Sequence, residues 1–286
     1  MIEIVKDKSE EIISFLENTG YFLLNEQEKH QYQTFNKEDG SLLTELDLAS
    51  EMIIKNELKS LFGNIPVLSE ENTEGENIEI AKQKYFFLLD PIDGTKSFNK
   101  GGEFTINLAL CVDRKPVVSF IHNPIKKVGL FGDNSKAFIR SNGKITKLLK
   151  LKSVDYSLYK NNHQKQLHLA CGDSVSKDII EHSITHIQNL GYTFEKQHIK
   201  IAPALGKVLV IANGECDFTI TSHLCKDWDV LPALPILNAL NVKYYTANPE
   251  VYYNNNFNSG VLLTAKNNEL LEELIPIFFN QNSTNE

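Results

Sequence analysis

The stretch from Tyr85 to Phe98, which reads Y-F-F-L-L-D-P-I-D-G-T-K-S-F, constrains the fold of this chain more than any other. It begins with five apolar residues, 85–89, a run that is short enough and β-prone enough for a strand buried on both faces. Two carboxylates, Asp90 and Asp93, follow this run. The predicted strand therefore delivers two acidic side chains at its end.

The residues after the two acids predict a helix start. Gly94 allows the backbone an unusual dihedral angle, and residues 95–97 can begin a helix whose first amide groups have no partner inside the helix. Acidic ligands beside a helix N-terminus suit a divalent cation and a phosphate group together. The stretch by itself therefore predicts a site for both.

The size and charge of the chain limit its partners. Its 286 residues can bury a sizeable core, either as one large domain or as two packed halves. The hydrophobic content of 42% and the charged content of 23% are ordinary for a soluble globular protein. A net charge of −8 argues against a nucleic-acid polymer as the main partner. A small phosphorylated substrate remains compatible, because a bound metal supplies positive charge locally.

The cysteines and the N-terminus predict a cytoplasmic location. The four cysteines form no C-x-x-C pair and have no spacing typical of a zinc site, so they are expected to be small buried residues in a reducing compartment. The N-terminus is too acidic and too polar for a secretory signal. No apolar run is long enough for a membrane span.

The first 40 residues are expected to form one helix and a connection. The apolar positions in residues 3–18 recur at helical spacing, and Gly20 is expected to end this helix. The polar run 25–40 predicts an irregular connection.

A second helix is expected within residues 41–62. Thr44 lies three residues before Asp47, which is the spacing of a capping box with Asp in place of the usual Glu. A short strand at 65–68 should follow, and the acidic segment that runs to Glu79 is expected to be a loop.

The two parts of the chain beyond this point have different patterns of predicted secondary structure. Apolar segments separated by turn signals predict an antiparallel meander over residues 105–149. The second half alternates strands with helices, which indicates an α/β layer. Strands are expected at 166–171, 192–199, 217–221, 243–246 and 261–265, and helices at 176–190, 203–213, 229–239 and 268–279. The segment 150–162 is the expected boundary between the halves.

Two other interpretations apply to D-P-I-D-G-T when it is taken alone. Phosphatases of the haloacid dehalogenase type carry D-x-D-G-T, in which the carboxylates lie two residues apart, whereas here they lie three apart with a proline between them. A plain Asp-rich turn after a strand is the second alternative.

The order of motifs along the whole chain favours a third interpretation. Asp47, Glu70-Glu71, the D-P-I-D-G-T segment at 90–95 and Trp228-Asp229 together resemble the inositol monophosphatase superfamily of metal-dependent, lithium-sensitive phosphatases. Within that superfamily, three features are similar to the bacterial 3'(2'),5'-bisphosphate nucleotidase branch. They are T-K-x-F at 95–98, G-E-F-T-x-N at 102–107, and Lys207 seven residues before Gly214.

The resemblance implies an α/β class and a layered α-β-α-β-α sugar-phosphatase fold. It implies an N-terminal α+β half, residues 1–150, which carries most of the metal ligands. A C-terminal α/β half, residues 151–286, contributes Asp229 and the pocket for the leaving group. A homodimer is expected on the same ground.

The resemblance also implies a role for each site residue. Thr95, hydrogen-bonded to Asp47, would orient the nucleophilic water and help to deprotonate it. The implied ligands of two or three Mg²⁺ ions are Glu70, Asp90, the backbone carbonyl of Ile92, Asp93 and Asp229. The implied groups that bind substrate and phosphate are Gly94, Thr95, Lys96 and Lys207.

Purely structural roles remain as alternatives for several of these residues. Asp229 can be a helix N-cap, Glu71 can be an exposed charge, and Lys96 and Lys207 can be surface lysines. Trp228 is expected in the core.

The C-terminal half departs from the family pattern. The usual W-D-x-A-A-G reads W-D-V-L-P-A at 228–233, and the segments around Cys171 and Ala204 also differ. The predicted function is a Mg²⁺-dependent phosphomonoesterase, with the 3'-phosphate of adenosine 3',5'-bisphosphate as the expected substrate. The alternatives are an inositol monophosphatase or other sugar phosphatase, and a non-catalytic relative that binds a metal or nucleotide.

Overall fold

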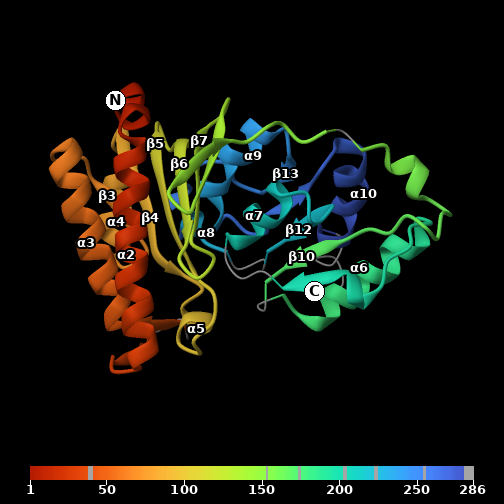
Figure 1. Ribbon diagram of the computed structural model, residues 1–286, viewed down its shortest axis with the longest axis horizontal. Coiled ribbons are helices and arrows are strands. Elements are labelled where there is room, and N and C mark those ends of the chain that lie inside the picture. Colours follow the sequence, from red (N-terminus) through yellow and green to blue (C-terminus); the bar gives the residue numbers. More distant parts are fainter. Residues whose placement is uncertain are drawn as a thin grey trace.

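The computed structural model describes residues 1–37, 41–152, 154–172, 175–201, 205–221, 225–253 and 256–279. Within these residues the chain forms a seven-stranded sheet with the order β3-β4-β5-β6-β7-β8-β9 and a five-stranded sheet with the order β11-β10-β12-β14-β13. Helices lie outside both sheets and between them, as Figure 1 shows. The layers therefore follow the expected α-β-α-β-α order.

The N-terminal helices form the first layer. They are α1 (Ile2–Asp7) and α2 (Ser9–Lys29). The prediction that Gly20 ends this helix is wrong, because α2 continues for nine further residues. A Cβ atom on Gly20 would lie 2.8 Å from the His122 ring and from Cγ of Pro124, so this glycine lets the helix approach the sheet closely. Gly20 therefore allows close packing of α2 on the sheet and does not end the helix.

A small hairpin precedes the third helix. Strands β1 (Thr34–Asn36) and β2 (Leu42–Thr44) pair antiparallel, so the predicted irregular connection over 25–40 is wrong in part. Helix α3 spans Glu45–Phe62. The predicted capping box is confirmed, because the Thr44 side chain accepts from the amide of Asp47, and the Asp47 carboxylate accepts from the amide of Thr44.

A helix replaces the predicted acidic loop. Helix α4 spans Glu74–Ala81, and a second capping box between Thr73 and Glu76 starts it. Asn77 and Ala81 are buried against the sheet. The side-chain cap and the buried face stabilise a helix in a segment whose acidic composition indicated a loop.

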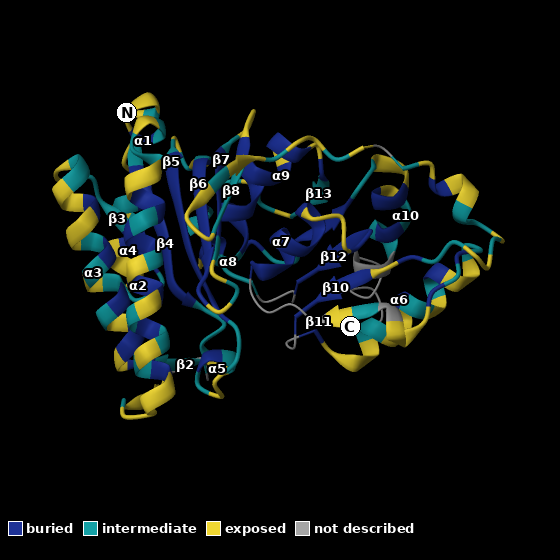
Figure 2. Ribbon diagram, viewed as in Figure 1, coloured by how far each residue is buried: buried dark blue, intermediate teal, exposed yellow. Residues whose placement is uncertain are grey.

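The seven-stranded sheet holds the two predicted acids. Its first strand, β3 (Val67–Ser69), runs parallel to β4 (Tyr85–Asp93). The remaining strands form the predicted antiparallel meander: β5 (Thr105–Val112), β6 (Lys115–Asn123), β7 (Val128–Asp133), β8 (Ala137–Ser141) and β9 (Lys144–Lys147). Figure 2 shows this sheet as mostly buried, with exposed residues on the outer helices.

Strand β4 is buried on both faces, as its apolar run predicts. Phe87 and Leu89 pack in a core with α2 and α3, whereas Phe86 and Leu88 pack in a second core with α7–α9. Alternating side chains along a strand point to opposite faces, so one apolar run serves two cores.

The five-stranded sheet lies in the second half of the chain. Its strands are β10 (Leu169–Cys171), β11 (Ile199–Ile201), β12 (Phe218–Ile220), β13 (Lys243–Tyr245) and β14 (Leu263–Ala265). Its helices are α6 (Lys177–Asn189), α7 (Gly206–Ala212), α8 (Asp227–Val230), α9 (Leu234–Leu240) and α10 (Asn268–Phe279). Three short 3₁₀ helices also lie in this half: η1 (Tyr156–Tyr159), η2 (Lys196–His198) and η3 (Leu231–Ala233).

Two predictions for this half are wrong. The strand expected at 192–199 is replaced by η2 and the start of β11. The continuous helix expected at 229–239 is divided into α8, η3 and α9, because Pro232 and Pro235 have no amide hydrogen to donate. The predicted helix start at Pro203 lies outside the described residues. None of the described helices combines the length and the apolar character needed to cross a membrane.

Candidate metal centre

A bulge in β4 turns Asp90 and Asp93 to the same side. Asp90 pairs with Asn107 and Asp93 pairs with Thr105 across the β4–β5 ladder, with a register irregularity between the two pairs. β4 therefore advances three residues while β5 advances two, which is the signature of a bulge. In a regular strand, residues three apart would point to opposite faces. The extra residue explains how the spacing D-P-I-D can build a single site.

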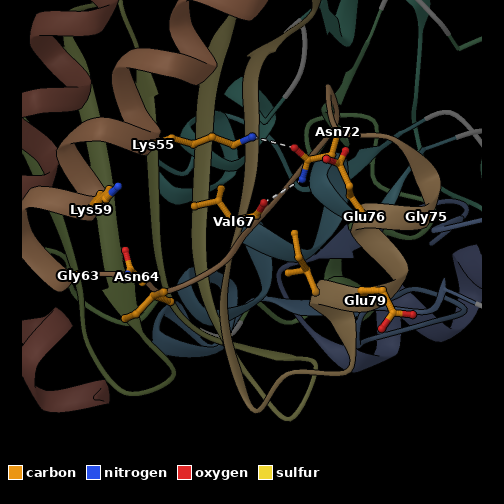
Figure 3. Close-up of a pocket in the computed structure, with 11 residues that line it drawn as sticks. Lys55, Lys59, Gly63, Asn64, Val67, Asn72, Gly75, Glu76 and Glu79 are labelled. Atoms are coloured by element: carbon orange, nitrogen blue, oxygen red, sulfur yellow. Dashed lines mark hydrogen bonds between the residues drawn. The ribbon is translucent and has the colours of Figure 1, made fainter.

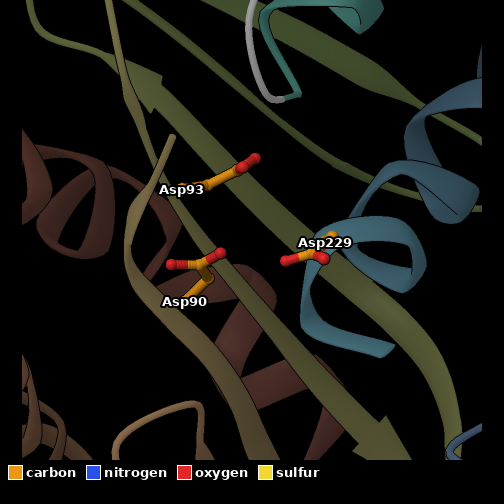
Figure 4. A group of neighbouring side chains, drawn as sticks. All are labelled: Asp90, Asp93 and Asp229. Atoms are coloured by element: carbon orange, nitrogen blue, oxygen red, sulfur yellow. The ribbon is translucent and has the colours of Figure 1, made fainter. Parts of the chain in front are cut away.

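The third acid comes from the other half of the chain. Asp229 lies in α8, and its Oδ2 accepts a 2.8 Å hydrogen bond from the amide of Lys226. Asp90, Asp93 and Asp229 each offer an oxygen within 4.8 Å of the other two. Figure 4 shows the three side chains gathered between β4 and α8. Asp229 is therefore not the N-cap of the alternative interpretation, since Lys226 holds that position. It closes the capping box as the third residue of α8 and also completes an acidic cluster.

The electrostatics of the cluster fit a bound cation. Burial and the neighbouring carboxylates raise the pKa of Asp90 and of Asp229 well above the usual range. Crowded carboxylates of this kind are stabilised either by protonation or by a cation. Because all the donors are hard oxygen atoms, the residues present fit Mg²⁺.

Thr95 and Asp47 lie beside this cluster. The Thr95 hydroxyl is 3.2 Å from Oδ1 of Asp47 and 3.0 Å from the carbonyl oxygen of Ile92. Thr44 donates to Oδ2 of Asp47 from both its amide and its hydroxyl, at 2.7 and 2.6 Å. Burial raises the pKa of the Asp47 carboxyl to about 6 despite these hydrogen bonds. Asp47 therefore has one oxygen fixed by the helix cap and the other directed at Thr95.

Glu70 and Glu71 are joined by a lysine that the sequence did not reveal. The Lys37 ammonium lies 2.9 Å from each of the two carboxylates. Glu71 is 4% exposed at its side chain, and burial next to Glu70 raises its pKa to about 7. Glu71 is therefore not a solvated surface charge. No sequence signal marks Lys37, because it lies in the segment expected to be irregular.

A cavity of about 710 Å³ is lined by the three aspartates, Glu70 and Thr95, whereas Asp47, Glu71 and Lys37 are not among its lining residues. Lys207 lies at its wall, 5% exposed, and burial lowers its pKa. Lys96 is exposed at the same cavity, and Gly94 adopts φ 95° directly before the short helix α5 (Thr95–Phe98). Lys207 is therefore not the surface lysine of the alternative interpretation. The predicted residues that line the cavity are Glu70, Asp90, Ile92, Asp93, Gly94, Thr95, Lys96, Lys207 and Asp229.

A second cavity of the same volume lies between α3 and α4 and has a different character. Lys55 donates to Oδ1 of Asn72 at 2.7 Å, and the Asn72 amide donates to the carbonyl of Val67, as Figure 3 shows. None of the predicted site residues lines it. The acidic cluster therefore distinguishes the first cavity as the candidate site.

The sequence also did not reveal the groups that hold Asp93. Thr105, Asn107 and the amide of Leu205 all donate to its Oδ2. Thr105 and Asn107 belong to the G-E-F-T-x-N segment. From the sequence, this segment indicates only a similarity to one branch of the superfamily and no role for its residues. Trp228 is buried beside Phe257, as expected for a core residue.

Comparisons with known proteins bear on the family and the fold of this chain. A family model described as the inositol monophosphatase family matches residues 10–282. The chain is 41% identical over 103 residues to the 3'(2'),5'-bisphosphate nucleotidase CysQ of Salmonella typhimurium, a match that spans 36% of this chain and only 42% of that protein. It is 28% identical over 235 residues to the protein of the same name from Aggregatibacter actinomycetemcomitans, with 79% of this chain and 82% of that protein covered. The solved structure of the Thermotoga maritima IMPase has the same fold, with a TM-score of 0.72 at 20% identity over 95% of this chain and 96% of that chain.

Proposed function

Because the chain belongs to the inositol monophosphatase family, we propose that it is a Mg²⁺-dependent phosphomonoesterase that removes the 3'-phosphate of adenosine 3',5'-bisphosphate. The observation that carries this proposal is the convergence of Asp90, Asp93 and Asp229 in one cavity, beside the hydrogen-bonded pair of Thr95 and Asp47.

The acidic residues of the cavity would hold the metal. Asp90, Asp93 and Asp229 supply clustered oxygens. Glu70 and Ile92 line the same cavity, so the Glu70 carboxylate and the Ile92 carbonyl are the further proposed ligands. When bound, Mg²⁺ neutralises charge on the phosphate and lowers the pKa of a water molecule. The family resemblance favours two or three ions. The protein's own contribution is to keep these carboxylates together and partly shielded from water.

Thr95 and Asp47 would handle the proton of the attacking water. A hydroxyl has one hydrogen and two lone pairs, so Thr95 can donate to Asp47 while it accepts from a water molecule. Asp47 is then the final acceptor of the proton, and its helix cap keeps the carboxylate oriented. No covalent intermediate with the enzyme is part of this scheme.

The cations of the cavity suit a substrate with more than one negative group. Lys207 is nearly buried in its wall and Lys96 is exposed at the same cavity. The amides of Gly94 and Thr95, at the start of α5, are the proposed ligands of the phosphate that is removed. The nucleotidase relatives supply the choice of adenosine 3',5'-bisphosphate. Inositol monophosphate or another sugar phosphate is the second candidate, because the family model carries that name.

A phosphate-release screen tests the proposal. Adenosine 3',5'-bisphosphate, inositol monophosphates and fructose bisphosphate are each incubated with the protein and Mg²⁺, and again with a chelator. We expect release from the nucleotide, loss of release with the chelator, and inhibition by lithium at concentrations at which sodium has no effect. Release from a sugar phosphate alone would change the substrate, and no release from any compound would favour a non-catalytic binding protein.

A further inference from the structure

The three carboxylates of the cluster are held in different ways. Asp90 accepts at Oδ1 from the amide of Ile92 at 3.1 Å, and Asp229 accepts at Oδ2 from the amide of Lys226 at 2.8 Å. Each of these two acids is thus oriented by a nearby backbone amide. Asp93 is the exception, because side chains of another strand reach it.

Three donors converge on a single oxygen of Asp93. Its Oδ2 accepts from Nδ2 of Asn107 at 2.7 Å, from the amide of Leu205 at 2.9 Å and from Oγ1 of Thr105 at 3.3 Å. Asn107 and Thr105 are both 0% exposed and face the same side of β5, since they lie two residues apart. They also pair with Asp90 and Asp93 across the bulge. The two strands therefore place the donors directly opposite the acids.

A carboxylate oxygen that accepts three hydrogen bonds has little lone-pair capacity left for a cation. We propose that Asn107 and Thr105 are positioning residues, which fix Oδ2 of Asp93 so that Oδ1 faces the bound cation. This inference rests on the metal site of the proposed function. It goes beyond that function because it assigns a role to two side chains that touch neither the substrate nor the metal.

The chemistry of Asn107 supports this role over a purely structural one. Its Oδ1 is buried and has no hydrogen-bond partner among the described residues. A buried polar atom without a partner costs roughly 1–3 kcal/mol. An aliphatic side chain at this position would avoid that cost. The benefit of an amide at position 107 therefore lies in its bond to Asp93.

Calorimetric titration of metal-free protein with Mg²⁺ tests the inference. We expect Asn107→Leu to weaken Mg²⁺ binding by about 10–100-fold, the range typical of groups that orient a metal ligand. The matched control is Ser119→Ala, since Ser119 is also buried on the neighbouring strand β6 and its Oγ has no partner among the described residues. This control should bind Mg²⁺ as the wild type does.

A second pair of variants keeps the test valid if Asn107→Leu does not fold. Thr105→Val removes the hydroxyl at nearly constant volume, and Thr105→Ser retains it. We expect weaker Mg²⁺ binding in the Val variant and near wild-type binding in the Ser variant. Thermal unfolding in the presence of chelator measures stability without metal, and the Val and Ser variants should differ little there.

The outcomes separate this inference from the proposed function. If the wild-type protein does not bind Mg²⁺, the proposed metal site itself is wrong. If the wild type binds and all the folded variants bind equally well, the metal site stands and the positioning role is overturned. A loss of stability in chelator with unchanged Mg²⁺ affinity also overturns it, because that result describes a structural role only.

Discussion

The hydroxyl of Thr95 lies 3.2 Å from Oδ1 of Asp47, so the start of α5 contacts the first turn of α3 across 48 positions of sequence. The same carboxylate closes the helix cap through its other oxygen. Asp47 thus takes part both in the start of α3 and in the candidate site. The helix cap fixes the orientation of its carboxylate before any substrate binds.

Removal of the Thr95 hydroxyl should abolish most of the activity. Thr95→Val keeps the shape of the side chain but can neither accept from water nor donate to Asp47. We expect kcat for phosphate release to fall by roughly 10²–10⁴-fold, the usual contribution of general acid–base catalysis, with a much smaller change in KM. Thr95→Ser retains the hydroxyl and is the matched control. Equal kcat values for the Val and Ser variants would exclude a role for the hydroxyl.

Neutralising one acid of the cluster should remove turnover but not the fold. Asp93→Asn and Asp229→Asn each delete a charged ligand, so we expect activity in Mg²⁺ to fall by more than about 100-fold, beyond the effect typical of residues that only orient a ligand. In chelator, thermal unfolding should occur at the wild-type temperature or above it, because each change relieves repulsion among buried carboxylates. Full activity of either variant would contradict the assignment of the metal centre.

Gly20 and Gly75 should respond in opposite directions to alanine. A Cβ on Gly20 would lie 2.8 Å from His122 and Pro124, so Gly20→Ala should destabilise the protein by about 1–3 kcal/mol through overpacking. Gly75 lies in α4 with nothing within 4 Å of the new Cβ, so Gly75→Ala should be neutral or stabilise by up to about 1 kcal/mol. Urea unfolding measures both. A Gly20→Ala protein as stable as the wild type would show that α2 can move away from the sheet.

His122 should make stability depend on pH. Burial lowers its pKa from 6.5 to about 4 in the folded protein, so between these values the unfolded state binds the extra proton. The contribution of His122 to the free energy of unfolding is therefore complete above pH 6.5, and it is lost as the pH falls toward 4. Between pH 7.5 and pH 5 the loss should be about 2 kcal/mol.

The His122 prediction needs a difference measurement, because other buried groups also titrate. Urea unfolding of the wild type and of His122→Gln at pH 7.5 and pH 5, both in chelator, isolates the histidine. The wild type should lose about 2 kcal/mol more than the variant between the two pH values. Parallel losses in the two proteins would show that His122 is not responsible.

Much of this protein could be predicted from short stretches of sequence. The apolar run before Asp90 encodes a strand buried on both faces, and Thr44 with Asp47 encodes a helix start. The antiparallel meander and helix α10 were also predicted, since they follow from local periodicity and turn residues. Such features depend on neighbours in the chain, so the pattern of residue types is sufficient to indicate them.

Two helical segments were predicted wrongly from their local sequence, because their structure depends on packing against distant parts of the chain. Gly20 resembles a helix stop, yet it lies inside α2 because the sheet leaves no room for a side chain there. The acidic segment before Ala81 resembles a loop, yet a side-chain cap and a buried face make it a helix.

The sequence by itself determined which acids this protein carries, their order along the chain and the strand and helix ends that present them. Only the tertiary structure decided how they meet. The bulge at Asp90–Asp93 turns two acids to one face, α8 brings Asp229 to them from the other half, and Lys37 joins the two glutamates. The reason is physical: helices, helix caps and hairpins form from residues close in sequence, whereas the site requires contacts that exist only after the sheets and helices pack.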